Sequence, residues 1–282
     1  MDIADVVVIG SGIGGLSCAA LLARYGFDVI VCESHSIAGG AAHAFERHGF
    51  KFDSGPSLYS GLSYKPSANP LRQVLDAIAE DLTWVTYDTW GCCLPEGDFD
   101  ATVGADQFFE VLSQLRGQDA VAEWHHLQRI MDLDPSLAPP GKHVIHVYTP
   151  GNEPYALWQE MNRNSQEYQQ QKQKRAEVMW KALERIIPDV RSRCDVTLVG
   201  TPLTHERFLR RHRGSYGPAI PAGKGFFPSS TTPLKGLLCC GDSTFPGIGL
   251  PAVAASGMIT ANTLAPVGKH LQMLQDIGYM YY

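Results

Sequence analysis

Continuous apolar runs alternate with small-residue turns at the start of the chain. Val6–Ile9 is an unbroken β-branched run, which predicts a strand buried on both faces of a parallel sheet. Residues 16–25 carry apolar side chains at helical spacing and predict a helix that Gly26 ends. Residues 28–32 form a second apolar run and predict a second strand. The order strand, helix, strand is typical of an α/β fold with a parallel sheet.

The rest of the chain has weaker hydrophobic patterns. Helical spacing predicts helices over residues 69–82, 105–115, 120–131 and 165–187. Short apolar runs predict strands at residues 143–149, 196–199 and 237–240, and a strand with a turn at residues 90–98. Residues 247–265 lack charge, but their Gly, Pro, Ser, Thr and Asn content favours a buried core helix over a membrane span.

A glycine-rich turn follows the first predicted strand directly. Gly10, Gly12 and Gly15 have the spacing G-x-G-x-x-G. The first glycine permits a tight turn, the second lets the backbone approach a pyrophosphate, and the third allows close packing of helix on strand. Glu33 ends the second strand about 20 residues later, where a carboxylate binds the adenosine ribose of a dinucleotide. Together these features predict dinucleotide binding.

Two further segments of small residues extend this prediction. Gly39 and Gly40 follow the second strand, where a nicotinamide-type unit would normally enter a crossover helix. They indicate either backbone passing close to a flat ligand or a plain glycine-rich turn. Asp242 follows the apolar run at residues 237–240, and open α/β sheets bind ligands at the carboxyl ends of their strands. A helix beginning near Leu250 would present free amides to an electron-rich group.

The pairing of two segments carries a family resemblance. The N-terminal VIGSGIGGLSCAALLARYGFDVIVCES together with the C-terminal GLLCCGDSTFPGIGLPAVAASGMITAN resembles the flavin-dependent group of carotenoid isomerases, phytoene desaturases and retinol saturases. The resemblance implies an α/β protein with a Rossmann-type FAD-binding fold, in which helices flank a parallel sheet, and a reduced α+β substrate region. It also implies FAD as cofactor and a long apolar polyene as substrate, for isomerisation, desaturation or saturation.

The resemblance also implies a set of cofactor-binding residues. They are Gly10, Gly12, Ile13, Gly14 and Gly15 at the pyrophosphate, Glu33 at the ribose, Gly39 and Gly40 along the flavin, Gly241 and Asp242 near the ribityl chain, and Gly249, Leu250 and Pro251 facing the flavin ring. The sequence identifies no side chain as a general acid or base, so the catalytic residues are left unassigned. It predicts no metal site.

Members of this group are considerably longer than 282 residues, so a large interior piece is expected to be missing, with the join near residues 131–132. The predicted organisation is an N-terminal part of the FAD domain at residues 1–65, a remnant of the substrate region at 66–225, and the C-terminal part of the FAD domain at 226–282.

Three alternative functions stay open. They are an amine-oxidase-type flavoenzyme, a non-catalytic remnant, and a nicotinamide dehydrogenase, in which Asp242 and its glycine loop would lack a purpose.

Charge and cysteine content indicate which partners the protein does not bind and which cellular compartment it occupies. The chain has 23 Lys and Arg against 29 Asp and Glu, which argues against a nucleic-acid surface. The basic run at residues 205–213 is interpreted as a solvated or anion-facing segment. Seven cysteines without metal-ligand spacing are typical of a reducing compartment. The start of the sequence shows no targeting peptide, which predicts a cytoplasmic protein or a plastid protein without its import segment. An apolar substrate implies peripheral membrane contact.

Overall fold

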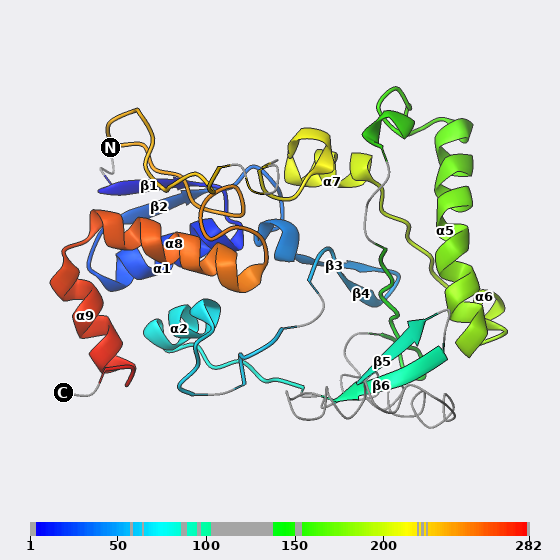
Figure 1. Cartoon of the computed structure of the whole chain (residues 1–282), viewed down its shortest axis with the longest axis horizontal. Coiled ribbons are helices and arrows are strands. Elements are labelled where there is room, and N and C mark those ends of the chain that lie inside the picture. The colour runs from blue at the N-terminus through cyan, green and yellow to red at the C-terminus, as the bar shows by residue number, and fades with distance from the viewer. Residues whose placement is uncertain are drawn as a thin grey trace.

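The computed structural model describes residues 4–56, 59–63, 65–85, 89–94, 97–102, 138–149, 154–218, 220, 223 and 225–280. Both ends of the chain build one half, with β1, β2, α1, α2, α8 and α9, while α5 and α6 lie at the opposite side and α7 lies between (Figure 1). The helices predicted at residues 105–115 and 120–131, and the join near 131–132, lie outside the described residues.

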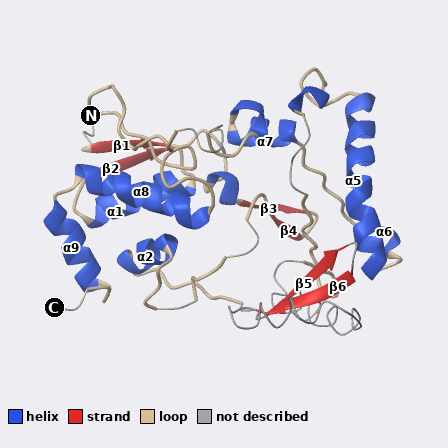
Figure 2. Ribbon diagram, in the orientation of Figure 1, coloured by secondary structure: helices blue, strands red, loops and turns tan. Residues whose placement is uncertain are grey.

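A parallel strand pair with a connecting helix forms the N-terminal unit. β1 (Val6–Ile9) pairs in parallel with β2 (Val29–Cys32), in a register that places Val6 beside Val29. α1 (Ile13–Arg24) connects the two strands (Figure 2). The Gly10 amide donates to the Cys32 carbonyl over 2.7 Å and extends the ladder into the turn. The predicted strand, helix and strand are therefore confirmed.

The strand pair is covered on one face only. Val6 packs against the core of α1, whereas Val7 and Ile9 are 56% and 86% exposed. The prediction that this strand is buried on both faces was therefore wrong. Parallel strands normally gain burial from neighbouring strands and from helices on both faces. In the described part of the chain this sheet has two strands, and residues 237–240 contribute only an isolated bridge between Thr231 and Leu238.

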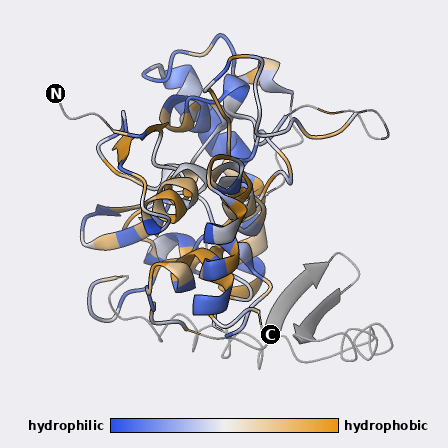
Figure 3. Ribbon diagram, turned by 90° about the vertical axis from the view of Figure 1, so that its left-hand side faces the viewer, coloured by the Kyte–Doolittle hydropathy of each residue, from blue (hydrophilic) through white to orange (hydrophobic). Residues whose placement is uncertain are grey.

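The core of this half forms where α8 (Leu250–Leu264) packs along α1. Small residues let the two helices approach, because a Cβ atom added to Gly257 would lie 2.4 Å from the Gly14 carbonyl oxygen. Leu21 and Leu22 of α1 are completely buried beside them. The helices facing the viewer in Figure 3 carry much of the apolar colouring. The predicted buried helix at residues 247–265 is thus confirmed.

Two further helices close this core. α2 (Pro70–Ala77) buries Val74, and α9 (Val267–Asp276) buries Met273. α2 is shorter than the helix predicted at residues 69–82, because Ala79 adopts a left-handed backbone conformation with φ of 58°. None of the described helices is long and apolar enough to cross a membrane.

A contact between a buried and a partly buried thiol joins the two ends of the chain. Cys18 of α1 is 3% exposed and is hydrogen-bonded to Cys240, which directly precedes the Gly241 turn. This hydrogen bond, together with burial, raises the pKa of the Cys18 thiol. Cys240 also packs against the hydrophobic cluster of α1, so the contact fixes the C-terminal segment beside the helix.

Two antiparallel hairpins follow the N-terminal unit. β3 (Ala44–Arg47) pairs with β4 (Phe50–Asp53), and a short helical turn η1 (Gly40–Ala42) precedes them. The two-residue turn of this hairpin has positive φ at His48 and Gly49, the backbone that tight hairpins favour. β5 (Thr89–Leu94) pairs with β6 (Gly97–Thr102), which agrees with the strand and turn predicted at residues 90–98.

The second half is built around a long polar helix. α5 (Gln166–Ile186) agrees with the prediction at residues 165–187. The remaining elements are η3 (Tyr155–Leu157), α6 (Val190–Arg193), α7 (Pro202–Leu209) and η4 (His212–Gly214). Residues 143–149 and 196–199 are not strands, because an extended segment needs a neighbouring strand to complete its hydrogen bonds and the described chain pairs neither segment with one.

Candidate functional site

Three glycine segments that are far apart in the sequence meet at one place. Gly12 and Gly39 form a parallel bridge. A Cβ atom added to Gly40 would lie 2.9 Å from the Gly12 Cα atom, and one added to Gly14 would lie 2.9 Å from the Gly241 Cα atom. The backbones therefore touch at distances that side chains would prevent. The structure brings together the segments predicted from the N-terminal turn, the Gly39–Gly40 loop and the Gly241–Asp242 turn.

The glycines of this cluster face two different environments. A Cβ atom added to Gly10, Gly12, Gly241 or Gly249 would meet no atom within 4 Å. A Cβ atom added to Gly15 would instead lie 2.3 Å from the Gly10 carbonyl oxygen. Gly12 therefore borders open space from which a ligand can approach the backbone, whereas Gly15 is needed for packing of α1 on β1. This division fits the distinct tasks expected of the second and third glycines.

The N-terminus of α1 opens at the centre of the cluster. Gly12 is the N-cap residue and supplies no side-chain cap, and the first turn carries no acidic residue. The first amides of a helix lack intrahelical partners, so those of Ile13, Gly14 and Gly15 are available to an anion. The helix dipole adds a partial positive charge at the same point. These residues fit the phosphates of a dinucleotide.

The start of α8 lies beside the start of α1. Val253 in its first turn lies 3.4 Å from the position of a Cβ atom on Gly14. Gly249 is the N-cap, without a side-chain cap, and Pro251 occupies the first turn. The residues predicted to face a flavin ring, Gly249, Leu250 and Pro251, thus begin a helix at the edge of the glycine cluster.

Glu33 lies at the end of β2 and is tied to the glycine turn. Its Oε2 atom accepts hydrogen bonds from the Ser11 hydroxyl and the Ser11 amide, both over 2.7 Å, and its Oε1 atom accepts one from the His35 amide. The bonds from Ser11 are the main reason that the pKa of Glu33 is lowered to about 2. A carboxylate has about four acceptor positions, so an ionised Glu33 retains capacity to accept a further hydroxyl.

Asp242 has two partners that sequence reasoning missed. Its Oδ1 atom forms an ion pair with Arg211, and its Oδ2 atom accepts a hydrogen bond from the Gly217 amide over 3.1 Å. Arg211 also donates to the Ser243 hydroxyl over 3.0 Å. The available signal was the basic run at residues 205–213, interpreted as solvated or anion-facing. The structure places one arginine of that run on the Asp242 carboxylate.

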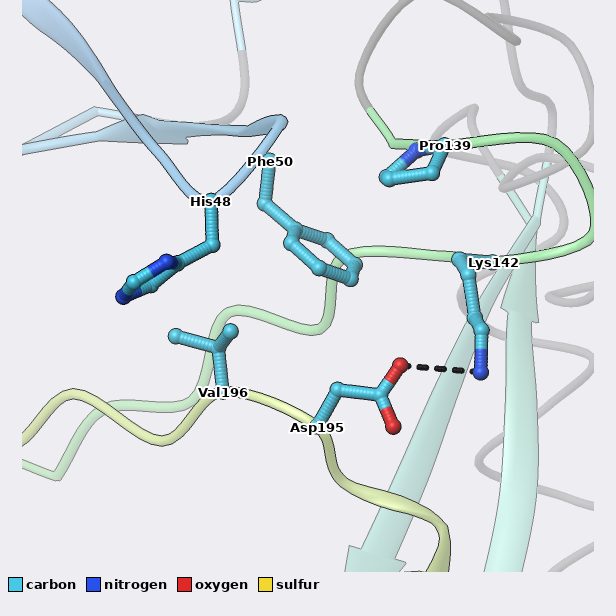
Figure 4. A pocket seen from close by; sticks show the side chains of 6 residues that line it. All are labelled: His48, Phe50, Pro139, Lys142, Asp195 and Val196. Carbon is cyan, nitrogen blue, oxygen red and sulfur yellow. Dashed lines mark ion pairs between the residues drawn. The ribbon is translucent and has the colours of Figure 1, made fainter.

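A separate cleft of about 410 Å³ lies near the β3–β4 hairpin (Figure 4). It is lined by His48, Phe50, Pro139, Lys142, Asp195 and Val196, and Lys142 and Asp195 form an ion pair of 2.8 Å across it. None of the predicted cofactor residues lines this cleft. The described ranges hold no cluster of His, Cys, Asp or Glu side chains that could bind a metal ion.

Comparisons with known proteins agree with this geometry. The family model described as an NAD(P)-binding Rossmann-like domain matches residues 8–77. The chain is 39% identical over 137 residues to prolycopene isomerase 1, chloroplastic, of an Oncidium hybrid cultivar. The aligned residues cover 47% of this chain and 23% of that relative. It is 48% identical over 81 residues to the human all-trans-retinol 13,14-reductase. These aligned residues cover 28% of this chain and 13% of that relative.

A third relative is prolycopene isomerase, chloroplastic, of Arabidopsis thaliana, which is 40% identical over 137 residues, or 47% of this chain and 22% of the relative. The matches therefore span less than a quarter of each relative's length. Fold and site together define a Rossmann-like dinucleotide-binding protein. More closely, the chain is similar in sequence to carotenoid isomerases and retinol reductases, the group that its motifs resemble.

Proposed function

We propose that this chain binds FAD and acts as a flavin-dependent oxidoreductase or isomerase on a long apolar polyene. The observation that carries the proposal is the meeting of the Gly10–Gly15 turn, the Gly39–Gly40 loop and the Gly241–Asp242 turn around the open N-terminus of α1. If the ligand were a nicotinamide dinucleotide, the Gly241–Asp242 turn would have no role beside the other two segments. In this proposal residues 1–65 and 226–282 build the cofactor domain, and residues 66–225 are the remnant of the substrate region.

Each predicted residue receives a task that its surroundings support. The amides of Ile13, Gly14 and Gly15 neutralise the pyrophosphate, which approaches along the open side of Gly10 and Gly12. Glu33 is ionised at neutral pH and accepts a hydrogen bond from a ribose hydroxyl.

The other segments hold the flavin half of the cofactor. Gly39 and Gly40 let it pass close to the backbone, and Asp242, beside Gly241, accepts a hydrogen bond from the ribityl chain. The uncapped start of α8, formed by Gly249, Leu250 and Pro251, faces the electron-rich edge of the ring.

Bound FAD would supply the redox chemistry of its isoalloxazine ring, and the protein would supply binding and orientation. The names of the relatives refer to prolycopene and to all-trans-retinol, both apolar polyenes. We extend that substrate class to this chain. The substrate region determines which polyene binds and which of its bonds is altered. In this proposal the chain carries a reduced form of that region.

The first experiment is to incubate the purified protein with FAD, remove free cofactor by desalting, and record the visible absorption spectrum. Retained flavin bands, with no comparable retention of NAD or NADP, are expected. Polyene isomerisation and saturation assays with reduced and oxidised flavin would follow, and primary amines would serve as substrates for the amine-oxidase alternative. A protein that retains nicotinamide but not flavin would contradict the proposal.

A second candidate function is that of a non-catalytic remnant. Two observations favour it: the chain matches less than a quarter of each reported relative, and its parallel sheet has only two strands in the described part. This candidate predicts a folded but colourless protein after FAD incubation. A yellow protein that leaves polyenes unchanged under all redox conditions would also favour it over the enzyme.

Peripheral membrane contact is proposed because an apolar substrate must leave a lipid phase. Phe226, Phe245 and Ile248 are 97%, 59% and 55% exposed. The Phe245 amide donates to the Pro228 carbonyl over 2.8 Å, so these apolar side chains lie on neighbouring loops that flank the Gly241 turn. Flotation with neutral liposomes is expected to carry the protein upward, and Phe226→Asp is expected to reduce it. Equal flotation of both proteins would refute this contact.

A further inference from the structure

Arg211 connects the second half of the chain with the predicted cofactor site. Its guanidinium forms an ion pair with Asp242 and donates to the Ser243 hydroxyl over 3.0 Å. The two charged side chains are 27% and 19% exposed, so the pair is largely shielded from water. Such shielding makes a charge-assisted contact more effective than one between exposed side chains.

The backbone around Arg211 is shaped for this contact. α7 ends at Leu209, and Arg210 adopts a left-handed conformation with φ of 53°. Arg213 is left-handed as well, with φ of 56°. Non-glycine residues adopt this conformation only rarely. The chain therefore leaves the helix through a sharp turn, and this turn places Arg211 beside Asp242.

The turn is anchored on both sides to the α5 half of the chain. Glu206 accepts hydrogen bonds from the Arg213 amide over 3.1 Å and from the Tyr155 hydroxyl. The start of α7 is held through Thr201, whose hydroxyl is hydrogen-bonded to the Tyr168 hydroxyl over 2.7 Å. The segment that carries Arg211 is thus fixed before and after the arginine, and Arg211 is its ionic contact with the Gly241 turn.

We propose that Arg211 is a positioning residue of the cofactor site, which holds the Asp242 carboxylate in the orientation that the cofactor meets. Arg211 occupies an acceptor position on one Asp242 oxygen, and the Gly217 amide occupies one on the other. Each oxygen keeps a further acceptor position, and the neighbouring Gly241 borders open space, since a Cβ atom added there would meet no atom within 4 Å. This inference rests on the proposed binding of FAD. It makes residues 66–225 part of the cofactor site rather than a dispensable remnant.

The test compares four proteins in two measurements. They are the unaltered chain, Arg211→Ala, Arg211→Lys, and the matched control Arg207→Ala. The control removes the same charge from an exposed position on α7, four residues before Arg211, where Arg207 lies over the Phe208 ring. The first measurement is FAD affinity by flavin fluorescence titration. We expect Arg211→Ala to weaken FAD affinity about tenfold, the lower end of the loss of about 10- to 100-fold that follows removal of a residue that orients a ligand-binding side chain. Arg211→Lys should recover part of the loss, and Arg207→Ala should match the unaltered chain.

A double-mutant cycle separates positioning from a general structural effect. If Arg211 acts through Asp242, then Arg211→Ala should have little further effect on FAD affinity in an Asp242→Asn background. An equal loss in both backgrounds would overturn the inference. So would equal affinities of Arg211→Ala and Arg207→Ala.

The second measurement needs no cofactor. The Gly217 amide donates to Asp242, so its hydrogen exchange, followed by NMR in the empty protein, reports whether the carboxylate is held in place. Faster exchange is expected in Arg211→Ala than in Arg207→Ala. Unchanged exchange would overturn the assignment of Arg211. Absence of FAD binding in the unaltered chain, with faster exchange in Arg211→Ala, would defeat the proposed function but leave the contact with Asp242 intact.

Discussion

Gly12→Ala is expected to weaken cofactor binding and leave the fold in place. Gly12 has φ of −67°, which alanine adopts freely, and an added Cβ atom meets no protein atom within 4 Å. Alanine is a poorer N-cap than glycine, but it also gives a less flexible unfolded chain, a gain of about 0.4–1 kcal/mol. The free energy of unfolding of the empty protein should therefore change by less than about 1 kcal/mol.

The same methyl group occupies the space through which the pyrophosphate approaches. Forcing an additional methyl group into a close contact costs about 1–3 kcal/mol. At about 1.4 kcal/mol per tenfold change, FAD affinity should fall roughly 10- to 100-fold. A fluorescence titration with FAD measures this directly.

Gly15→Ala is the matched substitution with the opposite expectation. Its Cβ atom would lie 2.3 Å from the Gly10 carbonyl oxygen and 3.3 Å from Cγ1 of Val8, so backbone must move even without cofactor. Unfolding free energy should fall by about 1–3 kcal/mol, which lowers the thermal midpoint by about 2–4 °C for each kcal/mol. Circular dichroism melts of the empty proteins compare the two variants. Equal destabilisation by both, or unchanged FAD affinity in Gly12→Ala, would refute the reasoning.

Four further outcomes follow from the described contacts. Arg72 is 1% exposed and forms an ion pair of 2.8 Å with an acidic residue of α2, so Arg72→Leu should lower the free energy of unfolding by about 3–5 kcal/mol in urea titrations. Arg193→Ala, which breaks a 3.5 Å pair between exposed side chains, should change it by less than about 1 kcal/mol. The pKa of Glu33 is lowered to about 2, so its contact with Ser11 stabilises the fold above its usual pKa of about 4.3 and is lost as pH falls towards 2. In Ser11→Ala, a carboxyl NMR titration should show a higher pKa for Glu33. Because hydrogen bonding to its partner thiol and burial raise the pKa of Cys18, that thiol should resist alkylation at neutral pH until the protein is unfolded.

The parts of the fold that sequence reasoning predicted correctly depend on local patterns. β1, α1 and β2 follow from one continuous stretch, in which an apolar run, glycines at fixed spacing and a helical repeat all point to the same structure. α5 follows from its length and helical spacing, and α8 from an uncharged run of small residues that begins near a proline. The three glycine segments could be located from sequence because each carries its own turn residues.

The parts that were missed depend on partners elsewhere in the chain. Residues 143–149 and 196–199 have strand composition, but a strand forms only where another strand completes its hydrogen bonds. Exposure of Val7 and Ile9 could not be foreseen either, because a buried parallel strand and a half-covered one have the same apolar run. The Arg211 contact with Asp242 depends on a left-handed turn at Arg210, for which arginine carries no sequence signal.

The packing of α1 on α8 has a consequence for synthesis of the chain. α1 ends at Arg24 and α8 begins at Leu250, so most of the polypeptide is made between the two partners of this core. At about 5–20 residues per second, α1 waits on the order of 10–50 s for α8 to leave the ribosome. During that time Leu21 and Leu22, which are completely buried in the finished protein, lack the cover that α8 gives them. The nascent N-terminal unit is therefore a natural substrate for chaperones, and chains that stop before residue 250 should be degraded or aggregate rather than accumulate.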